Sequence, residues 1–183
     1  MAFSIADRFT VSLARRSGFT LIELLMAMLI MCILLAMAMP SMRSFISQNR
    51  LASEVNLFIA ATVLARGEAI KRGRPVLICR SVGANQCAAS ASGDRDGSDW
   101  GSGWLVMEKD TGQVLLRQGA LADNTNVKAS RSAISYNGAG NVGGTFANLV
   151  FSHDGKFIRT VCIGRSGRVN LLIGVGACDG PSN

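Results

Sequence analysis

Two arginines in a glycine-rich segment near the C-terminus are the residues best suited to binding a ligand. Arg165 and Arg168 stand in the run Gly164-Arg165-Ser166-Gly167-Arg168. Guanidinium groups make charged hydrogen bonds to phosphate oxygens, and flexible glycines let backbone donors approach the same anion. The run predicts either a phosphate contact, for example with DNA, or a plain solvated hairpin turn. Further cations could widen a basic patch, although the sequence does not bring them together: Lys128, Lys156 and Arg159.

The other polar residues form no catalytic or metal-binding pattern. His153 is the only histidine, and it stands beside Asp154 without a Ser or Cys nucleophile motif. Asp94, Asp96 and Asp99 have the composition of a calcium loop, but their spacing departs from the EF-hand order and no Glu closes it. We therefore expect a solvated loop here, and no metal, no cofactor, no small-molecule substrate and no enzymatic activity.

Four of the five cysteines predict two disulfides. Cys79, Cys87, Cys162 and Cys178 lie in the polar part of the chain, whereas Cys32 lies in an apolar run, where a thiol behaves as a small hydrophobe. An even count on an exported chain favours disulfides formed outside the cytoplasm, and the spacing matches no zinc pattern. Among three connectivities we favour the pairing of neighbours, Cys79–Cys87 around a polar loop and Cys162–Cys178 across the last hairpin.

Gly18 marks a cleavage site that precedes an apolar segment. An ordinary secretory signal has its small-residue site after the apolar core, whereas residues 1–18 are polar and end in Arg15-Arg16-Ser17-Gly18. A cut after Gly18 would leave the apolar segment on a mature protein that begins at Phe19. The basic pair would hold the leader on the cytoplasmic side of the membrane.

The charge of the chain favours an anionic partner. Its 183 residues suffice for one ordinary domain, and they carry a formal net charge of +7 with a pI near 9.7. Residues 1–18 hold a net +2, so the mature chain would keep +5. A basic balance of this size is typical of contact with anionic phospholipid or nucleic acid.

The residues after Gly18 predict one long helix with two halves. Phe19–Met39 carries a single charge, Glu23, and about 20 helical residues cross the hydrocarbon core of a membrane. Pro40 either ends this span or softens the helix, because it lacks an N–H donor. Beyond it, apolar residues recur at helical spacing, so the second half is amphipathic and should end near Lys71.

After residue 73 the sequence changes to short β-like runs separated by turn residues. Asp154-Gly155 predicts a tight hairpin turn, and Trp100 and Trp104 are expected in the core or at a sheet edge. Seven strands are predicted: Val76–Arg80, Trp104–Glu108, Gln113–Arg117, Ala133–Tyr136, Asn148–Phe151, Thr160–Ile163 and Val169–Ile173. We expect an α+β fold, with the amphipathic half-helix packed on an antiparallel sheet.

The chain thus divides into four predicted segments. They are a leader (1–18), the transmembrane half of the helix (19–40), its amphipathic half (41–72) and a β-rich globular domain (73–183).

The N-terminal motif resembles the class III signal of type IV prepilins and type II secretion pseudopilins. The matching residues are Gly18-Phe19-Thr20-Leu21-Ile22-Glu23, with Arg15-Arg16 before them and the apolar run behind. The resemblance implies that a prepilin peptidase cuts after Gly18 and methylates the amine of Phe19. It also implies that Glu23 neutralises that amine, on its own or an adjacent subunit, during assembly; the alternative is a Glu23 that reaches lipid headgroups. Pro40 falls where many pilins carry a helix-softening proline.

The globular part is similar to the GspH/FimT branch of minor pilins and pseudopilins. Its matching features are a strand ending in Cys79, a second cysteine at Cys87, the strand Gly103–Val106 and the late Gly167-Arg168-Val169. The branch implies a helix packed on a β-domain and a place at or near a filament tip. FimT-like pilins that take up DNA are similar in having C-terminal Gly-Arg arginines, although here one extra residue separates Arg165 from Arg168.

These features together predict a minor type IV pilin that takes part in pilus assembly and contacts DNA weakly, without sequence preference, during uptake. The alternative is a pseudopilin of a type II secretion pseudopilus. The expected partners are other pilin or pseudopilin subunits and the prepilin peptidase. The expected location is the bacterial inner membrane, crossed once with the C-terminal domain in the periplasm, and then the filament.

Overall fold

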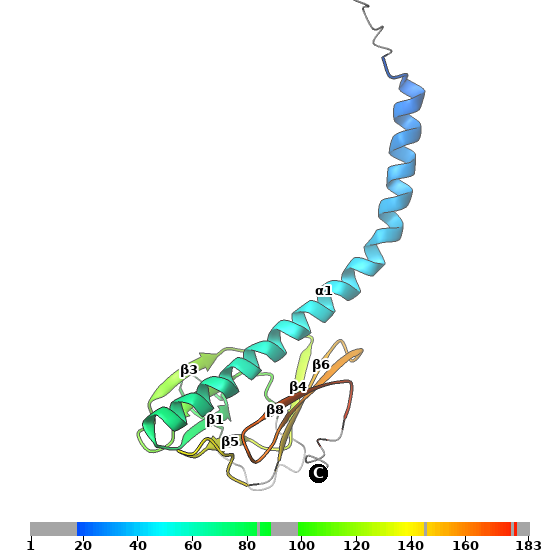
Figure 1. Ribbon diagram of the computed structural model, residues 1–183. Helices are drawn as coiled ribbons and strands as arrows, with labels where there is room; N and C mark the ends of the chain where they lie inside the picture. The colour runs from blue at the N-terminus through cyan, green and yellow to red at the C-terminus, as the bar shows by residue number, and fades with distance from the viewer. Residues whose placement is uncertain (1–17, 84, 89–98, 145, 177, 179–183) are drawn as a thin grey trace, which may run out of the picture. The chain divides into compact units, whose positions relative to one another are not determined.

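The computed structural model describes residues 18–83, 85–88, 99–144, 146–176 and 178 (Figure 1). These residues form helix α1, Leu21–Arg72, and eight strands. The strands are β1 Val76–Arg80, β2 Trp104–Glu108, β3 Val114–Gln118, β4 Thr125–Ala129, β5 Ala133–Tyr136, β6 Ala147–His153, β7 Phe157–Ile163 and β8 Val169–Ile173. The chain divides into two compact units, Met1–Met42 and Arg43–Asn183, and α1 contributes to both.

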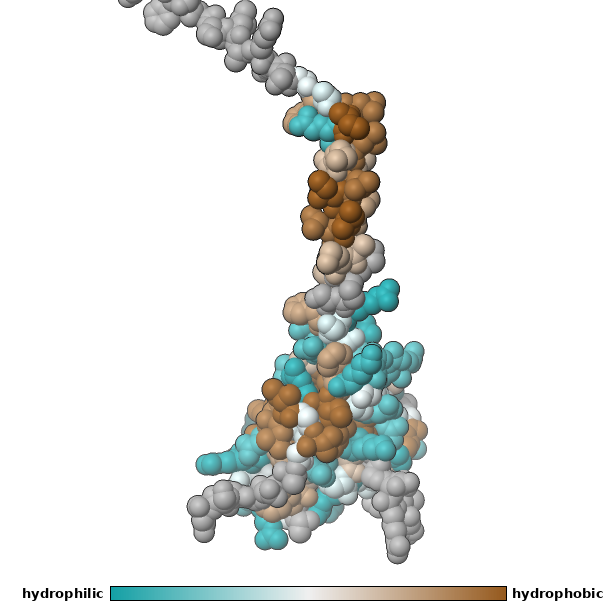
Figure 2. All heavy atoms as spheres, turned by 90° about the vertical axis from the view of Figure 1, so that its right-hand side faces the viewer, coloured by the Kyte–Doolittle hydropathy of each residue, from teal (hydrophilic) through white to brown (hydrophobic). Residues whose placement is uncertain are grey.

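The first unit contains the start of α1, which a threonine caps. The Thr20 hydroxyl accepts the N–H of Glu23 at 3.3 Å, and the Thr20 carbonyl accepts the N–H of Leu24 at 3.2 Å. Thr20 and Glu23 thus occupy the two positions of a capping box. The apolar side chains that follow are exposed, as the brown spheres of Figure 2 show.

By length and hydropathy, the described part of the chain holds no single helix that qualifies as a membrane span. The pair Leu21–Met37 and Met42–Arg72 passes the same test when taken together.

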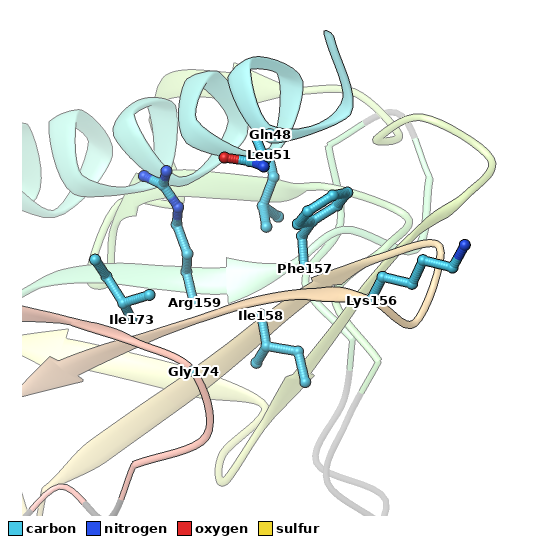
Figure 3. A pocket seen from close by; sticks show the side chains of 8 residues that line it. All are labelled: Gln48, Leu51, Lys156, Phe157, Ile158, Arg159, Ile173 and Gly174. Atoms are coloured by element: carbon cyan, nitrogen blue, oxygen red, sulfur yellow. The ribbon is translucent and has the colours of Figure 1, made fainter. Parts of the chain in front are cut away.

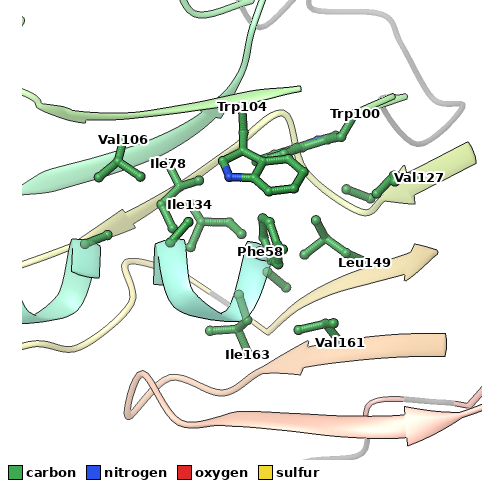
Figure 4. Close-up of a cluster of buried hydrophobic side chains, with 14 of the residues drawn as sticks. Phe58, Ile78, Trp100, Trp104, Val106, Val127, Ile134, Leu149, Val161 and Ile163 are labelled. Carbon is green, nitrogen blue, oxygen red and sulfur yellow. The ribbon is translucent and has the colours of Figure 1, made fainter. Parts of the chain in front are cut away.

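In the second unit, one face of α1 is buried against the strands. Apolar or small residues recur on this face every three or four positions, as an amphipathic helix requires. They are Leu51, Val55, Phe58, Ala61, Ala65 and Ala69. The alanines let the strands approach the helix closely, and Phe58 fills the space near its middle (Figure 4).

The strands form two antiparallel sheets, which corrects the expectation of one. The first has the order β3-β2-β1-β5 and the second the order β4-β6-β7-β8. Phe58 contacts aromatic rings from both sheets: its centroid lies 5.2 Å from that of Trp104 on β2 and 5.7 Å from that of Phe151 on β6. Trp100 adds an edge-on contact at 5.9 Å. Both tryptophans are fully buried, so they belong to the core.

Most predicted strands are confirmed, and one strand was missed. The bounds of β1, β2, β5 and β8 agree with the prediction, β3 begins one residue later, and β6 and β7 are longer. The missed strand is β4, whose sequence Thr-Asn-Val-Lys-Ala holds a single large apolar residue, Val127. Only its pairing with β6 and the burial of every second side chain define it as a strand.

The predicted turn at Asp154-Gly155 joins β6 to β7. Asp154 has a φ of 52° and Gly155 a φ of 65°, and the N–H of Lys156 donates to the carbonyl of His153 at 3.1 Å. Two consecutive positive φ angles match the twist of paired strands, and Asp and Gly tolerate them well.

Tyr136 should make the second unit less stable at alkaline pH. Burial raises the pKa of its phenol from 10.0 to about 12, and nearby Arg66 and Thr62 oppose this shift. The folded state holds the proton more tightly, so the stability from the neutral phenol is complete below pH 10 and is lost as the pH rises towards 12.

Between pH 9 and 11 we expect the unmodified protein to lose about 1 kcal/mol more unfolding free energy than Tyr136→Phe. Urea denaturation at the two pH values measures the difference. Equal losses in both proteins would contradict the assignment to Tyr136.

Candidate functional site

The residues predicted for processing lie at the beginning of the described chain. Phe19 is 84% exposed, and Glu23 lies in the first turn of α1. A Cβ added to Gly18 would meet no atom within 4 Å, so the surrounding structure does not require glycine there. Arg15 and Arg16 lie outside the described residues. Pro40 falls within the bounds of α1, which continues beyond it to Arg72.

Two disulfides tie loops to the sheets. Cys79 of β1 is bonded to Cys87, and Cys162 of β7 is bonded to Cys178, with Cα atoms 5.5 and 5.4 Å apart. These are the neighbour pairings favoured from the sequence. The first bond holds the loop after β1, and the second holds the chain that follows β8. Cys32 is a free, exposed thiol in the first unit.

His153 has a structural partner. Its Nδ1 lies 2.8 Å from the Thr125 hydroxyl, which links β6 to β4, and its Nε2 lies 3.7 Å from a carboxylate oxygen of Asp154. The Asp99 carboxylate accepts the N–H of Gly101 at 2.8 Å, while Asp94 and Asp96 lie outside the described residues. No group of three His, Cys, Asp or Glu side chains able to hold a metal ion is found among the residues described.

The predicted arginine pair lies on the turn between β7 and β8. Arg165 and Arg168 are both exposed. Backbone hydrogen bonds fix the turn: the N–H of Gly164 donates to the Arg168 carbonyl, and that of Gly167 donates to the Gly164 carbonyl, both at 2.9 Å. A third bond, from the N–H of Val142 to the Arg165 carbonyl, ties the turn to the neighbouring loop. The guanidinium groups therefore project from a fixed backbone.

Gly167 is required by this packing. It has a φ of 73°, and a Cβ there would lie 2.4 Å from the Gly140 carbonyl oxygen and 3.1 Å from Nε of Arg66. The glycine of the Gly167-Arg168 motif thus has a structural role, because it lets the turn contact α1 and the loop at Gly140. The exposed Arg168 beside it is not under this constraint.

Two grooves flank the turn and share Arg168 and Asn170. One, of about 410 Å³, runs between the turn and α1 and includes Thr62 and Arg66. The other, of about 310 Å³, includes Phe146 and Ser166. No Asp or Glu from the described residues lines either groove. The sequence analysis did not identify Arg66. The one indication in the sequence is its position seven residues after Ile59, which places both residues on the face of α1 that lines this groove.

The other predicted cations do not join this site. Lys156 and Arg159 line a separate groove of about 280 Å³, in which Arg159 points towards α1 near Gln48 while Lys156 points away (Figure 3). Lys128 is an exposed residue of β4, in the second sheet. The basic site therefore centres on the β7–β8 turn and Arg66.

Comparison with known proteins matches both parts of the chain. The family described as type II transport protein GspH matches residues 54–167, more than half of the chain, and the prokaryotic N-terminal methylation motif matches residues 13–39. No curated protein sequence matches.

The fold is that of solved minor pilins. The type IV minor pilin FimU of Pseudomonas aeruginosa is 20% identical, with a TM-score of 0.55 over 74% of this chain and 99% of that one. A second crystal form of FimU gives a TM-score of 0.50 at 20% identity, over 70% and 98%. The minor pseudopilin EpsH from the type 2 secretion system of Vibrio cholerae is 13% identical, with a TM-score of 0.47 over 68% and 97%.

An N-terminal methylation motif and a helix packed on antiparallel sheets define the class of pilin-like filament subunits. Within that class, the chain belongs to the GspH family. Its role is that of a minor pilin or pseudopilin, and such proteins act by assembling with other pilin-like subunits.

Proposed function

We propose that this chain is a minor subunit of a type IV pilus and that it contacts DNA through Arg165 and Arg168. The observation that carries the proposal is the exposed arginine pair on a turn whose backbone is fixed by hydrogen bonds. Neither arginine forms an ion pair with a carboxylate of the described residues, so both guanidinium charges remain available to phosphate oxygens. Contacts of this kind position a protein on DNA without reading its sequence.

The route to the filament begins in the inner membrane. The apolar residues 19–40 anchor the precursor there with the globular part in the periplasm, a prepilin peptidase cuts after Gly18 and methylates Phe19, and Glu23 then pairs with the new amine. The methylation motif supports this route. Exposed apolar residues of β8 supply a surface for other subunits: Leu171, Leu172 and Ile173.

A second candidate is a pseudopilin of a type II secretion system. The description of the matching family, a type II transport protein, favours it. In either case the proposed role is structural, and the membership of a pilin-like family supports it. Deletion of the gene separates the two: loss of pili and DNA uptake supports the pilus, and loss of exoprotein release supports the secretion system.

DNA binding by the full-length protein in nonionic detergent tests the arginine pair. We expect binding to double-stranded DNA of any sequence, with a Kd of about 1 µM or weaker at moderate salt, because few phosphates are contacted. Arg165→Gln combined with Arg168→Gln should lower the log–log dependence of affinity on salt by roughly two units, with thermal stability unchanged.

Lys109→Gln is the control for charge alone, since Lys109 is exposed and lies outside both grooves. An equal loss in this control would assign binding to net charge. If the unmodified protein does not bind DNA even at low salt, the proposed DNA contact is wrong and the role is that of a purely structural pilin.

A further inference from the structure

We propose that Arg66 of α1 and Arg168 of the β7–β8 turn together bind one phosphate of the DNA backbone. The inference rests on the DNA contact proposed above and adds a residue 99 positions away from Arg165 in the sequence. The proposed position of the phosphate is then the groove between the turn and α1, and not the tip of the turn.

The groove between the turn and α1 has the size and the lining to hold a phosphate. It has a volume of about 410 Å³, and its polar lining consists of hydrogen-bond donors or amphoteric groups: Thr62, Arg66, Arg168 and Asn170. Apolar contact comes from Ile59 and Val63 of the same helix. The Thr62 hydroxyl already donates to the Ile59 carbonyl at 2.6 Å, so the donors for an anion are the two guanidinium groups and the Asn170 amide. They match a tetrahedral anion, because arginine presents a planar fork of N–H donors.

The charge of Arg66 is not compensated by a carboxylate of the described residues. No carboxylate among the described residues forms an ion pair with it, and its Nε is buried without a hydrogen-bond partner. A buried donor on a charged group is costly when its charge is not compensated. An anion in the groove would supply the missing charge. The phenol of Tyr136, which interacts electrostatically with Arg66, stays neutral at ordinary pH because burial raises its pKa to about 12.

Arg66 is also held in place. Its side chain passes between Gly140 and Gly167: a Cβ on either glycine would lie 3.1 Å from Nε of Arg66. Both glycines have positive φ angles, 76° and 73°, so side chains are disfavoured there in any case. Binding by a fixed guanidinium loses less conformational entropy than binding by a free one.

The shared residue Arg168 extends the site. It lines both grooves that flank the turn, with Arg66 in one and Ser166 in the other. Successive phosphates of one DNA strand can therefore be held on either side of Arg168, the first with Arg66 and the second with Ser166. Arg165 is exposed on the same turn but lines neither groove.

The test measures the salt dependence of DNA affinity for Arg66→Gln in the full-length protein in nonionic detergent. We expect affinity about tenfold lower at low salt, and a log–log slope smaller by about 0.9, the value for one phosphate contact. Arg66→Lys should restore most of the slope, because it keeps the charge. Arg50→Gln is the matched control: it removes the same charge from an exposed position of the same helix, and both slope and affinity should stay within error.

A measurement on the unmodified protein covers the case in which Arg66→Gln fails to fold. The NMR resonance of the Arg66 Nε–H should shift when a short DNA duplex is added, and the side-chain N–H of Arg50 should not. An unshifted Arg66 resonance, or a folded Arg66→Gln that behaves like Arg50→Gln while the Arg165/Arg168 double variant loses affinity, overturns this inference alone. An unmodified protein that does not bind DNA overturns the proposed DNA contact and this inference with it.

Discussion

Replacing Gly18 with valine should leave the protein as an uncut precursor while its folded units remain unchanged. A Cβ at Gly18 would meet no atom within 4 Å, so the structure around it tolerates a side chain. A requirement for glycine at this position would then come from outside the chain, from a peptidase that admits only a residue without bulk. Valine is the stricter test, because its branched and stiff side chain adds more bulk at Cβ than alanine does.

The measurement is N-terminal sequencing, with intact mass, of protein recovered from membranes. The unmodified protein should begin at Phe19 with an added methyl group, and Gly18→Val should begin at Met1 or Ala2. Gly18→Ala, which adds the smallest side chain, should be cut more slowly but still at the same bond. A mature chain that begins after Met39, or an unmodified protein that keeps residues 1–18, would contradict the prepilin route.

The strands that sequence patterns located are those whose signals are local. Val76–Arg80 and Trp104–Glu108 are dense in β-branched, aromatic or large apolar residues, and Asp154-Gly155 specifies its own turn through two positive φ angles. Strand β4 has no such signal. It is defined by its pairing with β6, whose residues lie 20 to 28 positions away in the sequence, and by the burial of every second side chain.

The division into two sheets depends on contacts between distant residues in the same way. A pattern of alternating residues shows that a strand has a buried face, but it does not show which strand is the neighbour. In this chain the two sheets meet at Phe58 of α1. Its ring contacts Trp104 of the first sheet and Phe151 of the second, so both sheets pack on the same helix.

The basic site shows the same limit. Arg165 and Arg168 are three residues apart in the sequence, and their turn was located from glycine and arginine content alone. Arg66 joins Arg168 only because Gly140 and Gly167 allow two loops to close on α1. Neither glycine is near Arg66 in the sequence, so no local pattern could have assigned Arg66 to the site.

Glu23 should be essential for entry into the filament because of its charge. Two substitutions separate this role from the part that its side chain could play in the capping box with Thr20. The structure places Glu23 three residues after Thr20, whose hydroxyl accepts the Glu23 N–H at 3.3 Å. Glutamine is as suitable as glutamate at this position of a capping box, whereas alanine is not. Both variants keep the bond from the backbone N–H of residue 23 to the Thr20 hydroxyl. Glu23→Gln removes only the charge, whereas Glu23→Ala also removes the side chain that could complete the capping box.

If Glu23 neutralises the amine of Phe19, both variants should insert into the membrane at least as well as the unmodified protein, because a carboxylate within a membrane costs roughly 2.5–3.5 kcal/mol. Both should then be reduced at least tenfold in sheared filaments, since each leaves an uncompensated amine among apolar helices. Glu23→Asp is the matched control that keeps the charge, and it should enter filaments far better than either variant.

Quantitative immunoblots measure the amount of each variant in the sheared-filament fraction relative to the membrane fraction. This ratio decides between the two roles. The charge accounts for assembly if Glu23→Gln fails as completely as Glu23→Ala. The side-chain half of the capping box accounts for it if Glu23→Gln assembles normally while Glu23→Ala does not, because glutamine keeps that half and alanine does not. Normal incorporation of both variants would remove Glu23 from the assembly mechanism and leave it the plainer role of a carboxylate close to the lipid headgroups.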